Sequence, residues 1–277
     1  MEITNLQGYV ELNNKVKMPY FGLGVFLMKD GQEVIDAVMH ALEAGYIHID
    51  TAALYNNEIG VGEAIRNSSV HRKDIFVTSK VWNSDQGYDS TLKAFDKSLE
   101  KLGFDYLDLY LVHWPVKGKY KSTWKAIEEL YKQGRVKSIG VSNFLQHHLE
   151  DLIDSAEIIP MVNQVEFHPY LVQQDLIDFC VKYKIQFEAW SPLMQGKMLS
   201  DKLINKLALK YEKTAAQIIL RWNLQKGVVT IPKSSKQERI ISNSQIFDFK
   251  ISLDDMKLID GLDKSERIGA DPNNFNF

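Results

Sequence analysis

Residues 47–65 read Ile-His-Ile-Asp-Thr-Ala-Ala-Leu-Tyr-Asn-Asn-Glu-Ile-Gly-Val-Gly-Glu-Ala-Ile. The apolar residues at the start of this stretch predict a short strand that ends at Asp50, and the apolar spacing after Glu58 predicts a helix. Tyr55 falls in the Asn-rich loop between the two. The stretch therefore places an acid and a phenol where neither serves packing.

Two further strand candidates finish in the same way. The segment 75–80 reads Ile-Phe-Val-Thr-Ser-Lys and ends at Lys80, and the segment 107–113 reads Leu-Asp-Leu-Tyr-Leu-Val-His and ends at His113. Three consecutive strand candidates thus end on an ionisable residue, and this regularity organises the rest of the chain.

The composition indicates a folded protein that acts on a small molecule. A chain of 277 residues with 45% hydrophobic content is long and apolar enough for a sizeable core. Its 33 basic and 36 acidic residues are mixed along the chain and give a net charge of −3. Because there is no extended basic field, we expect no nucleic-acid partner and no membrane-surface partner.

Cysteine use and the amino terminus indicate a reducing compartment. Cys180 is the single cysteine, which excludes an internal disulfide framework and a multi-cysteine metal site, and its amphipathic setting predicts a buried small hydrophobe. The first residues show no basic segment followed by an apolar run, and no segment approaches a membrane span. We expect a cytoplasmic protein, and a monomer.

Strand and helix signals alternate eight times after a β-hairpin that residues 7–18 predict around Asn13-Asn14. The strand candidates lie near 20–24, 46–50, 75–79, 107–112, 136–141, 161–166, 186–191 and 228–231. The helix candidates lie at 31–44, 58–67, 90–102, 121–133, 146–155, 173–183, 201–210 with 214–225, and 236–246. Ser252 and the acids that follow it predict one more helix, at 252–262.

This order predicts a parallel sheet covered by helices. Doubly wound sheets and closed barrels both have this order of elements. Eight units in a chain of this length favour the (β/α)8 TIM barrel, an α/β fold. No linker divides the chain, so we expect residues 1–277 to form one domain. In a barrel the carboxyl ends of all strands meet at one mouth, which would bring Asp50, Lys80 and His113 together.

The side chains expected at this mouth suit carbonyl reduction. A phenol delivers a proton to the oxygen of a reduced carbonyl, and a nearby ammonium that favours phenolate makes Tyr55 a better acid. Lys80 would supply that charge, Asp50 would hold Lys80 ionised, and His113 would orient the substrate oxygen. The first hypothesis is therefore an enzyme with Tyr55 as its general acid.

The chain resembles the aldo-keto reductase superfamily, and its bacterial branch of diketogluconate reductases in particular. The matching motifs, in order, are Gly-Tyr-Ile-His-Ile-Asp-Thr-Ala with Tyr-Asn-Asn-Glu, Val-Thr-Ser-Lys-Val-Trp, Leu-Val-His-Trp-Pro, Ser-Ile-Gly-Val-Ser-Asn-Phe, Asn-Gln-Val-Glu-Phe-His-Pro and Ile-Pro-Lys-Ser. The resemblance implies a (β/α)8 barrel, NADPH-dependent reduction of aldehydes, dicarbonyls or keto-sugars, and a catalytic tetrad at Asp50, Tyr55, Lys80 and His113.

The resemblance also implies a binding site for NADPH or NADP+. The implied nicotinamide contacts are Ser142, Asn143 and Gln164, with Trp190 as the stacking aromatic; most relatives have tyrosine there, and the bacterial branch has tryptophan. The pyrophosphate is implied to follow Ser191, Leu193, Gln195 and Gly196. The adenosine 2′-phosphate and adenine are implied to contact Lys233, Ser234, Ser235, Arg239 and Asn243, although the family often has glutamate where this chain has Ser242.

Charge supports NADP(H) independently of the family. A phosphate at a helix N-terminus meets backbone N–H groups and the helix dipole. Lys233 and the two serines after it precede the helix expected to carry Arg239 in its second turn, and residues 233–236 contain no acid for a free ribose hydroxyl. We therefore expect the 2′-phosphate to be recognised here.

Other interpretations of these residues stay open at this point. His48 and Asp50 share a strand face, which would suit a metal-dependent barrel hydrolase, but no His-x-His motif follows and we expect no metal. Gly22-Leu23-Gly24 has the start of a dinucleotide fingerprint without its third glycine. A third hypothesis is a non-catalytic subunit that keeps the NADPH site as a redox sensor. Aromatic side chains are expected to line the substrate pocket, namely Phe26, Trp82 and Trp114.

Overall fold

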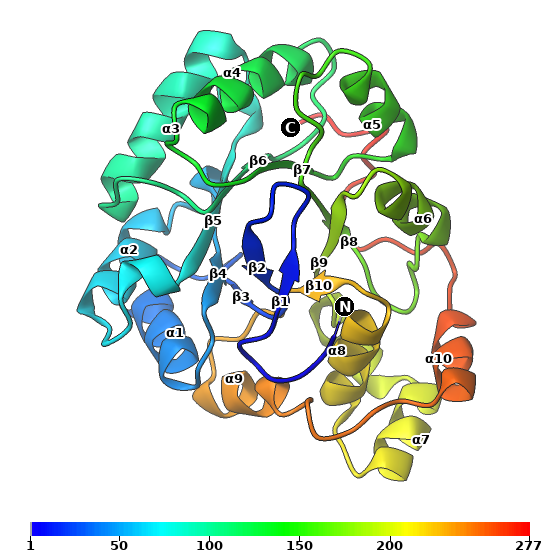
Figure 1. Ribbon diagram of the computed structural model, residues 1–277. Helices are drawn as coiled ribbons and strands as arrows, with labels where there is room; N and C mark the ends of the chain where they lie inside the picture. Colours follow the sequence, from blue (N-terminus) through cyan, green and yellow to red (C-terminus); the bar gives the residue numbers. More distant parts are fainter. Residues whose placement is uncertain (1) are drawn as a thin grey trace.

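The computed structural model describes residues 2–277 as a closed ring of strands surrounded by helices (Figure 1). Eight parallel strands follow one another around the ring in chain order. They are β3 (Leu23–Gly24), β4 (His48–Asp50), β5 (Phe76–Val81), β6 (Leu109–Val112), β7 (Ile139–Ser142), β8 (Val162–Glu166), β9 (Gln186–Trp190) and β10 (Val229–Thr230). The predicted (β/α)8 barrel is confirmed.

The ring closes between its first and last strands. Phe21 and Thr230 form a parallel bridge, Gly22 N donates to Thr230 O at 3.0 Å, and Thr230 N donates to Tyr20 O at 3.0 Å. A Cβ added to Gly24 would lie 2.9 Å from Ile231 O. The glycines at 22 and 24 therefore serve close packing at the seam and do not begin a dinucleotide fingerprint.

Helices cover the outside of the barrel, and each lies close to its predicted position (Figure 1). They are α1 (Gln32–Glu43), α2 (Glu58–Asn67), α3 (Tyr88–Leu102), α4 (Tyr120–Lys132), α5 (Gln146–Ile153), α6 (Gln174–Lys182), α7 (Lys202–Tyr211), α8 (Ala215–Gln225), α9 (Gln237–Ser244) and α10 (Leu253–Asp260). Ser252 caps α10 by accepting from Asp255 N at 3.2 Å, as its position predicts.

The predicted hairpin crosses the amino-terminal end of the barrel, in front of the ring in Figure 1. Its strands are β1 (Tyr9–Glu11) and β2 (Lys17–Pro19), with Met18 fully buried. The left-handed residue of its turn is Lys15, whose φ is 72°, and not one of the two asparagines. Those side chains instead hold the hairpin to the barrel: Asn13 Nδ2 donates to Pro160 O at 3.3 Å, and Asn14 Nδ2 to Lys137 O at 2.9 Å.

Three local expectations differ from the structure. Lys80 lies within β5 and not at its end, because the strand continues to Val81. His113 follows the last residue of β6. Helix α9 begins at Gln237, so Arg239 lies in its first turn and not its second. None of the helices in residues 2–277 combines the length and the apolar character needed to cross a membrane.

Candidate active site

The structure brings Asp50, Tyr55, Lys80 and His113 together at the carboxyl-terminal mouth of the barrel. Asp50 ends β4 and Lys80 lies near the end of β5, the next strand of the ring. His113 follows β6, and Tyr55 ends a short 3₁₀ helix at Ala53–Tyr55. Four separate loop or strand ends thus supply one cluster, as predicted for a barrel mouth.

Lys80 is the centre of this cluster. Its Nζ donates to Asp50 Oδ1 at 2.6 Å, to Thr51 O at 2.9 Å and to Tyr55 Oη at 3.4 Å. The Lys80 side chain is fully buried, and that of Asp50 is 3% exposed. A buried ammonium is retained only where anions and acceptors replace its water, and these three oxygens do so.

Burial sets the electrostatics of the pair and of the phenol. Burial alone would lower the pKa of Lys80, but the Asp50 and Tyr55 oxygens outweigh it and raise that pKa, so the ammonium persists. Burial raises the pKa of Tyr55, and the Lys80 charge opposes this rise without reversing it. The Lys80 charge therefore lowers the pKa of Tyr55, as expected, but by less than burial raises it. The phenol remains protonated at neutral pH, and this is the form that donates a proton.

His113 faces the phenol from the next strand. Its ring lies edge-on to Tyr55, with centroids 5.8 Å apart, and to Trp82, with centroids 5.1 Å apart. Burial, together with the Lys80 charge, lowers the pKa of His113 well below its usual value. The imidazole is therefore neutral near pH 7, and it can hydrogen-bond a substrate oxygen without carrying a charge.

A further buried ionisable side chain beside the tetrad, Glu188, was not predicted from the sequence. Gln164 Nε2 donates both to Asp50 Oδ2 at 2.7 Å and to Glu188 Oε2 at 3.0 Å. Burial, and secondly the Asp50 charge, raises the pKa of Glu188 to about 8. Glu188 stands two residues before Trp190 on β9, so the alternation of a strand was the one signal that could have directed it inward.

The amide groups next to the cluster leave oxygen atoms for a ligand. Asn143 Nδ2 donates to His113 O at 3.0 Å, and Trp190 Nε1 donates to Asn143 Oδ1 at 2.9 Å. Ser142 Oγ donates to Gln164 O at 2.7 Å. Within residues 2–277, Gln164 Oε1 has no donor, and Asn143 Oδ1 has one lone pair left. A primary amide, which brings two N–H donors, fits these acceptors.

The loop after β9 adopts an unusual backbone. Ser191, Met194 and Gln195 have φ values of 50°, 51° and 53°, and Gly196 has 92°. Left-handed conformations at non-glycine residues are costly and concentrate at ligand clamps. Ser191 and Leu193 are half-buried, while Gln195 and Gly196 are exposed, so the loop presents its backbone and side chains outward.

The predicted phosphate segment lies between β10 and α9. Lys233 and Arg239 are exposed, and within the described part of the chain neither forms an ion pair. Ser234 Oγ accepts from Lys236 N at 3.1 Å and shapes the turn, while Ser235 is half-buried and Asn243 is buried on α9. Two uncompensated cations beside a helix N-terminus fit an anion.

Aromatic side chains and the end of the chain enclose the mouth. Phe26 lies beside Tyr55, with centroids 4.9 Å apart. Phe277 stacks on Trp82 at 5.7 Å with an interplanar angle of 3°, and Phe275 packs on Trp114 at 5.1 Å. Phe26 and Trp82 thus contact the tetrad directly, whereas Trp114 contacts the end of the chain, which packs on both tryptophans.

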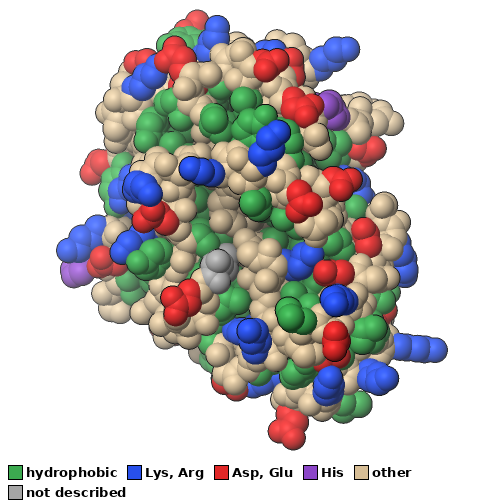
Figure 2. Space-filling view, turned by 45° about the vertical axis from the view of Figure 1, so that its right-hand side comes forward, with side chains coloured by type: hydrophobic (Ala, Val, Ile, Leu, Met, Phe, Trp, Pro, Cys, Tyr) green, Lys and Arg blue, Asp and Glu red, His purple; other side chains and the backbone are tan. Residues whose placement is uncertain are grey.

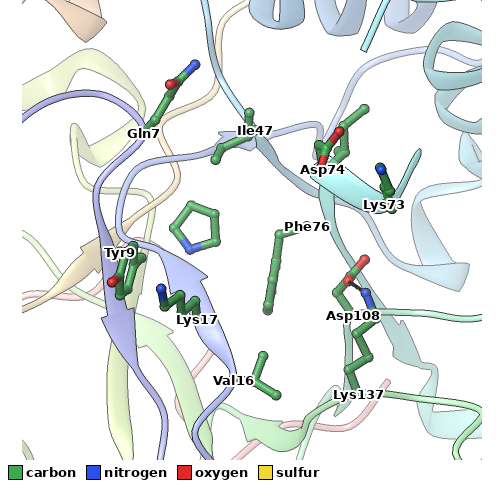
Figure 3. A pocket seen from close by; sticks show the side chains of 12 residues that line it. Gln7, Tyr9, Val16, Lys17, Ile47, Lys73, Asp74, Phe76, Asp108 and Lys137 are labelled. Atoms are coloured by element: carbon green, nitrogen blue, oxygen red, sulfur yellow. Dashed lines mark hydrogen bonds and ion pairs between the residues drawn. The ribbon is translucent and has the colours of Figure 1, made fainter. Parts of the chain in front are cut away.

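A hollow at the opposite end of the barrel does not belong to this site. It measures about 420 Å³, and Figure 3 shows Tyr9, Val16 and Lys17 of the hairpin facing Phe76 across it. Two of its lining residues form an ion pair, in which Lys137 Nζ lies 3.0 Å from Asp108 Oδ1. The hollow is the gap beneath the hairpin.

The residues weighed for other chemistry have structural roles. The ring of His48 is fully buried, with Nδ1 3.2 Å from Pro19 O and Nε2 3.3 Å from Thr78 Oγ1. No group of three or more His, Cys, Asp or Glu side chains among residues 2–277 is placed to hold a metal ion. Cys180 is free and buried on α6, as predicted.

Comparisons with known proteins identify relatives of this chain. A family model described as the aldo/keto reductase family matches residues 21–264. The glyoxal reductase of Bacillus subtilis is 58% identical, with 99% of each chain covered. The methylglyoxal reductase DkgA of Escherichia coli is 46% identical over 96% of this chain and 97% of its own. The structure of a Gox0644 mutant in complex with NADPH is 44% identical, covers 98% of this chain and 99% of that one, and superposes with a TM-score of 0.93.

Proposed function

Because the chain belongs to the aldo/keto reductase family and is an NADP-dependent oxidoreductase, we propose that it reduces small dicarbonyl aldehydes, with Tyr55 as the general acid. Two relatives similar over nearly their whole length are named for reduction of glyoxal and of methylglyoxal. The observation that carries the proposal is the contact of Lys80 Nζ with both Asp50, at 2.6 Å, and Tyr55, at 3.4 Å.

The residues that would hold the cofactor follow from the atoms left free. Gln164 Oε1 and Asn143 Oδ1 would accept from the nicotinamide carboxamide, whose two N–H donors fit them. Trp190 would stack on the ring, the left-handed loop at 191–196 would follow the pyrophosphate, and Lys233 with Arg239 would meet the 2′-phosphate. When bound, NADPH supplies the hydride.

The proton comes from the protein. Tyr55 Oη would donate it to the substrate oxygen as negative charge develops there, and the Lys80 ammonium would stabilise the phenolate left behind. Asp50 keeps that ammonium in place, and the neutral imidazole of His113 would hydrogen-bond the same oxygen. The aromatic walls of Trp82 and Trp114 would exclude water from the developing charge.

The test is turnover of a carbonyl panel, followed by NADPH absorbance. We expect glyoxal and methylglyoxal to be reduced faster than keto-sugars, since Phe275 and Phe277 occupy part of the mouth. Tyr55→Phe keeps the shape of the pocket but has no proton to give, so turnover should fall by about 10²-fold or more with NADPH binding retained. Equal turnover in Tyr55→Phe would refute the assigned role, and no turnover of any carbonyl by the wild type would favour the redox-sensing alternative.

A further inference from the structure

Glu166 is a buried carboxylate at the mouth that has no part in the chemistry described above. It ends β8 and is fully buried. Its Oε1 accepts from Ile268 N at 2.7 Å and lies 3.0 Å from His168 Nε2, and its Oε2 accepts from Gly269 N at 3.1 Å. One side chain therefore binds two consecutive backbone amides that lie about a hundred residues further along the chain.

The second amide belongs to a glycine that touches the proposed nicotinamide platform. A Cβ added to Gly269 would lie 2.4 Å from Trp190 Cη2 and 3.2 Å from Glu166 Oε2. Only glycine lets the backbone pass between the carboxylate and the indole. Trp190 is held from its other side, because its Nε1 donates to Asn143 Oδ1. The Glu166 anchor thus fixes the position of the terminal segment against Trp190.

Beyond this anchor the chain runs back over the substrate side of the mouth. Phe275 and Phe277 pack on Trp114, with centroids 5.1 and 5.2 Å away, and Asn83 Nδ2 donates to Phe277 O at 3.1 Å. The segment from Ile268 to Phe277 is therefore tied at its root by Glu166 and at its tip by the aromatic wall. Without the contact at residues 268–269, Phe275 and Phe277 would be held at the end of a longer flexible segment. The entropic cost of placing them on the aromatic wall would then be higher.

We propose that Glu166 is a positioning residue, which anchors residues 268–269 against Trp190 and thereby places Phe275 and Phe277 as a wall of the carbonyl pocket. The proposal rests on the proposed function of the mouth, since it assigns Trp190 to the cofactor and the aromatic wall to the substrate. Glu166 acts through the chain that it holds and does not touch the reacting atoms.

Glu166→Gln tests the anchor, because an amide offers one acceptor oxygen where the carboxylate offers two. The chain supplies a matched control in Glu128 on α4, a buried carboxylate that also accepts two consecutive backbone amides, Glu157 N and Ile158 N, both at 2.8 Å. Both of these amides meet the same oxygen, Glu128 Oε1, so Glu128→Gln loses the charge but can keep both contacts. Any effect of removing a buried charge should therefore be shared by the two variants, whereas loss of a backbone contact should be confined to Glu166→Gln.

The first measurement needs neither cofactor nor substrate. Hydrogen exchange at the Ile268 and Gly269 amides should accelerate about tenfold or more in Glu166→Gln, since hydrogen bonds to a charged group are being lost, and should not change in Glu128→Gln. Unchanged exchange in Glu166→Gln would overturn the anchor itself. This result does not depend on whether the protein reduces dicarbonyls.

The second measurement is steady-state turnover. In Glu166→Gln we expect the KM for methylglyoxal to rise about tenfold while kcat changes by less than about threefold, because the wall is displaced and the tetrad is not. Gly269→Ala, which keeps Glu166 but crowds Trp190, should raise KM in the same direction. An unchanged KM in both variants, or an equal rise in Glu128→Gln, would refute the proposal, whereas absence of wild-type turnover would refute only the proposed function.

Discussion

At the scale of single residues, Gln164 contacts two buried acids, Asp50 and Glu188, beside the buried cation of Lys80. Asp50 and Glu188 both lie against Gln164 Nε2, and Lys80 contacts only Asp50 of the two. Because burial raises the pKa of Glu188 to about 8, Glu188 holds its proton at neutral pH and the site carries one ion pair. A second negative charge would draw the Lys80 ammonium away from Tyr55.

Glu188→Gln should therefore change the dependence of stability on pH. Between the unfolded pKa of about 4.3 and the folded value of about 8, the folded wild type holds one more proton than the unfolded chain. The contribution of Glu188 to the free energy of unfolding must then fall as pH rises through this window, by up to about 1.4 kcal/mol per pH unit. Glutamine resembles the protonated acid in shape but does not titrate, so this component should vanish.

Urea unfolding of both proteins from pH 5 to pH 8 measures the difference. His48 Nε2, which lies 3.7 Å from Glu188 Oε1, adds a slope of the opposite sign up to the unfolded pKa of about 6.5, because burial lowers the folded pKa of His48 to about 3. This contribution is common to both proteins and cancels in their difference. The exposed Glu150→Gln serves as the control and should keep the wild-type slope. Parallel curves for wild type and Glu188→Gln would show that Glu188 is already ionised at pH 5.

Residues inside short contiguous motifs were predictable, and residues defined by distant partners were not. Asp50 and Tyr55 are five apart in the sequence, and each stands where a strand or loop ends, so their meeting at the mouth follows from the barrel alone. Glu166 lies in the motif Asn-Gln-Val-Glu-Phe-His-Pro, but its partners at 268–269 are about a hundred residues away in an irregular segment. No periodicity relates such positions, and only tertiary structure shows the contact.

At the scale of elements, periodicity predicted every helix and strand of the barrel, but it did not set their ends. Helix α9 begins three residues after Ser234, because Ser234 Oγ engages Lys236 N and holds an extended turn before the helix. The contact of Ser234 with a phosphate stays a prediction, and its hydroxyl stabilises this turn in the structure. Local hydrogen bonds between side chain and backbone compete with helix formation, and the spacing of apolar residues does not predict them.

The corrected position of α9 sharpens the prediction for cofactor choice. Lys233 precedes the helix and Arg239 lies in its first turn, so both cations stand beside its N-terminus. Lys233→Ala with Arg239→Ala should weaken NADPH binding by at least about tenfold, since each charge-assisted bond contributes roughly 1.5–3 kcal/mol. NADH lacks the 2′-phosphate and should bind nearly as before. Fluorescence titration of Trp190 with both cofactors decides this, and an equal loss for the two would place the phosphate elsewhere.

Helices α2 and α3 pack so closely that replacing a glycine by alanine should destabilise the protein, which is the opposite of the usual effect within a helix. Replacing glycine by alanine within a helix normally stabilises a protein by about 0.5–1 kcal/mol. A Cβ at Gly62 on α2, however, would lie 2.0 Å from Leu102 O at the end of α3. The backbones must separate, so we expect Gly62→Ala to lower the free energy of unfolding by about 1–3 kcal/mol.

Gly261, which follows α10, is the matched control for this effect. Its φ is −69°, and an added Cβ would meet its nearest atom at 3.4 Å, so Gly261→Ala should change stability by less than about 0.5 kcal/mol. Urea denaturation of both variants provides the comparison. A neutral Gly62→Ala would mean that α2 and α3 adjust without cost.

At the scale of the whole molecule, the two ends of the barrel do different work. Phe277 and the tetrad occupy the carboxyl-terminal mouth, while the hairpin crosses the other end above the hollow of Figure 3. Figure 2 shows acidic and basic side chains interspersed on one face of the molecule, so that face offers no field of a single sign. The proposed function is thus concentrated at one end, as is general for this fold.

This division predicts that stability and activity respond to different substitutions. Met18→Ala removes a fully buried side chain from the hairpin and should lower the free energy of unfolding by about 2–5 kcal/mol. Because Met18 lies at the amino-terminal end of the barrel, opposite the tetrad, kcat/KM for methylglyoxal should stay near the wild-type value at temperatures well below the melting temperature. Trp82→Ala removes a half-buried aromatic that contacts His113 and Phe277, and it should do the opposite, lowering kcat/KM strongly with a smaller loss of stability. The contrary result is a loss of kcat/KM in Met18→Ala as severe as that in Trp82→Ala, at a temperature where both variants are folded. That result would show that the two ends are energetically coupled through the strands, and the amino-terminal end of the barrel would then have to be counted as part of the active site.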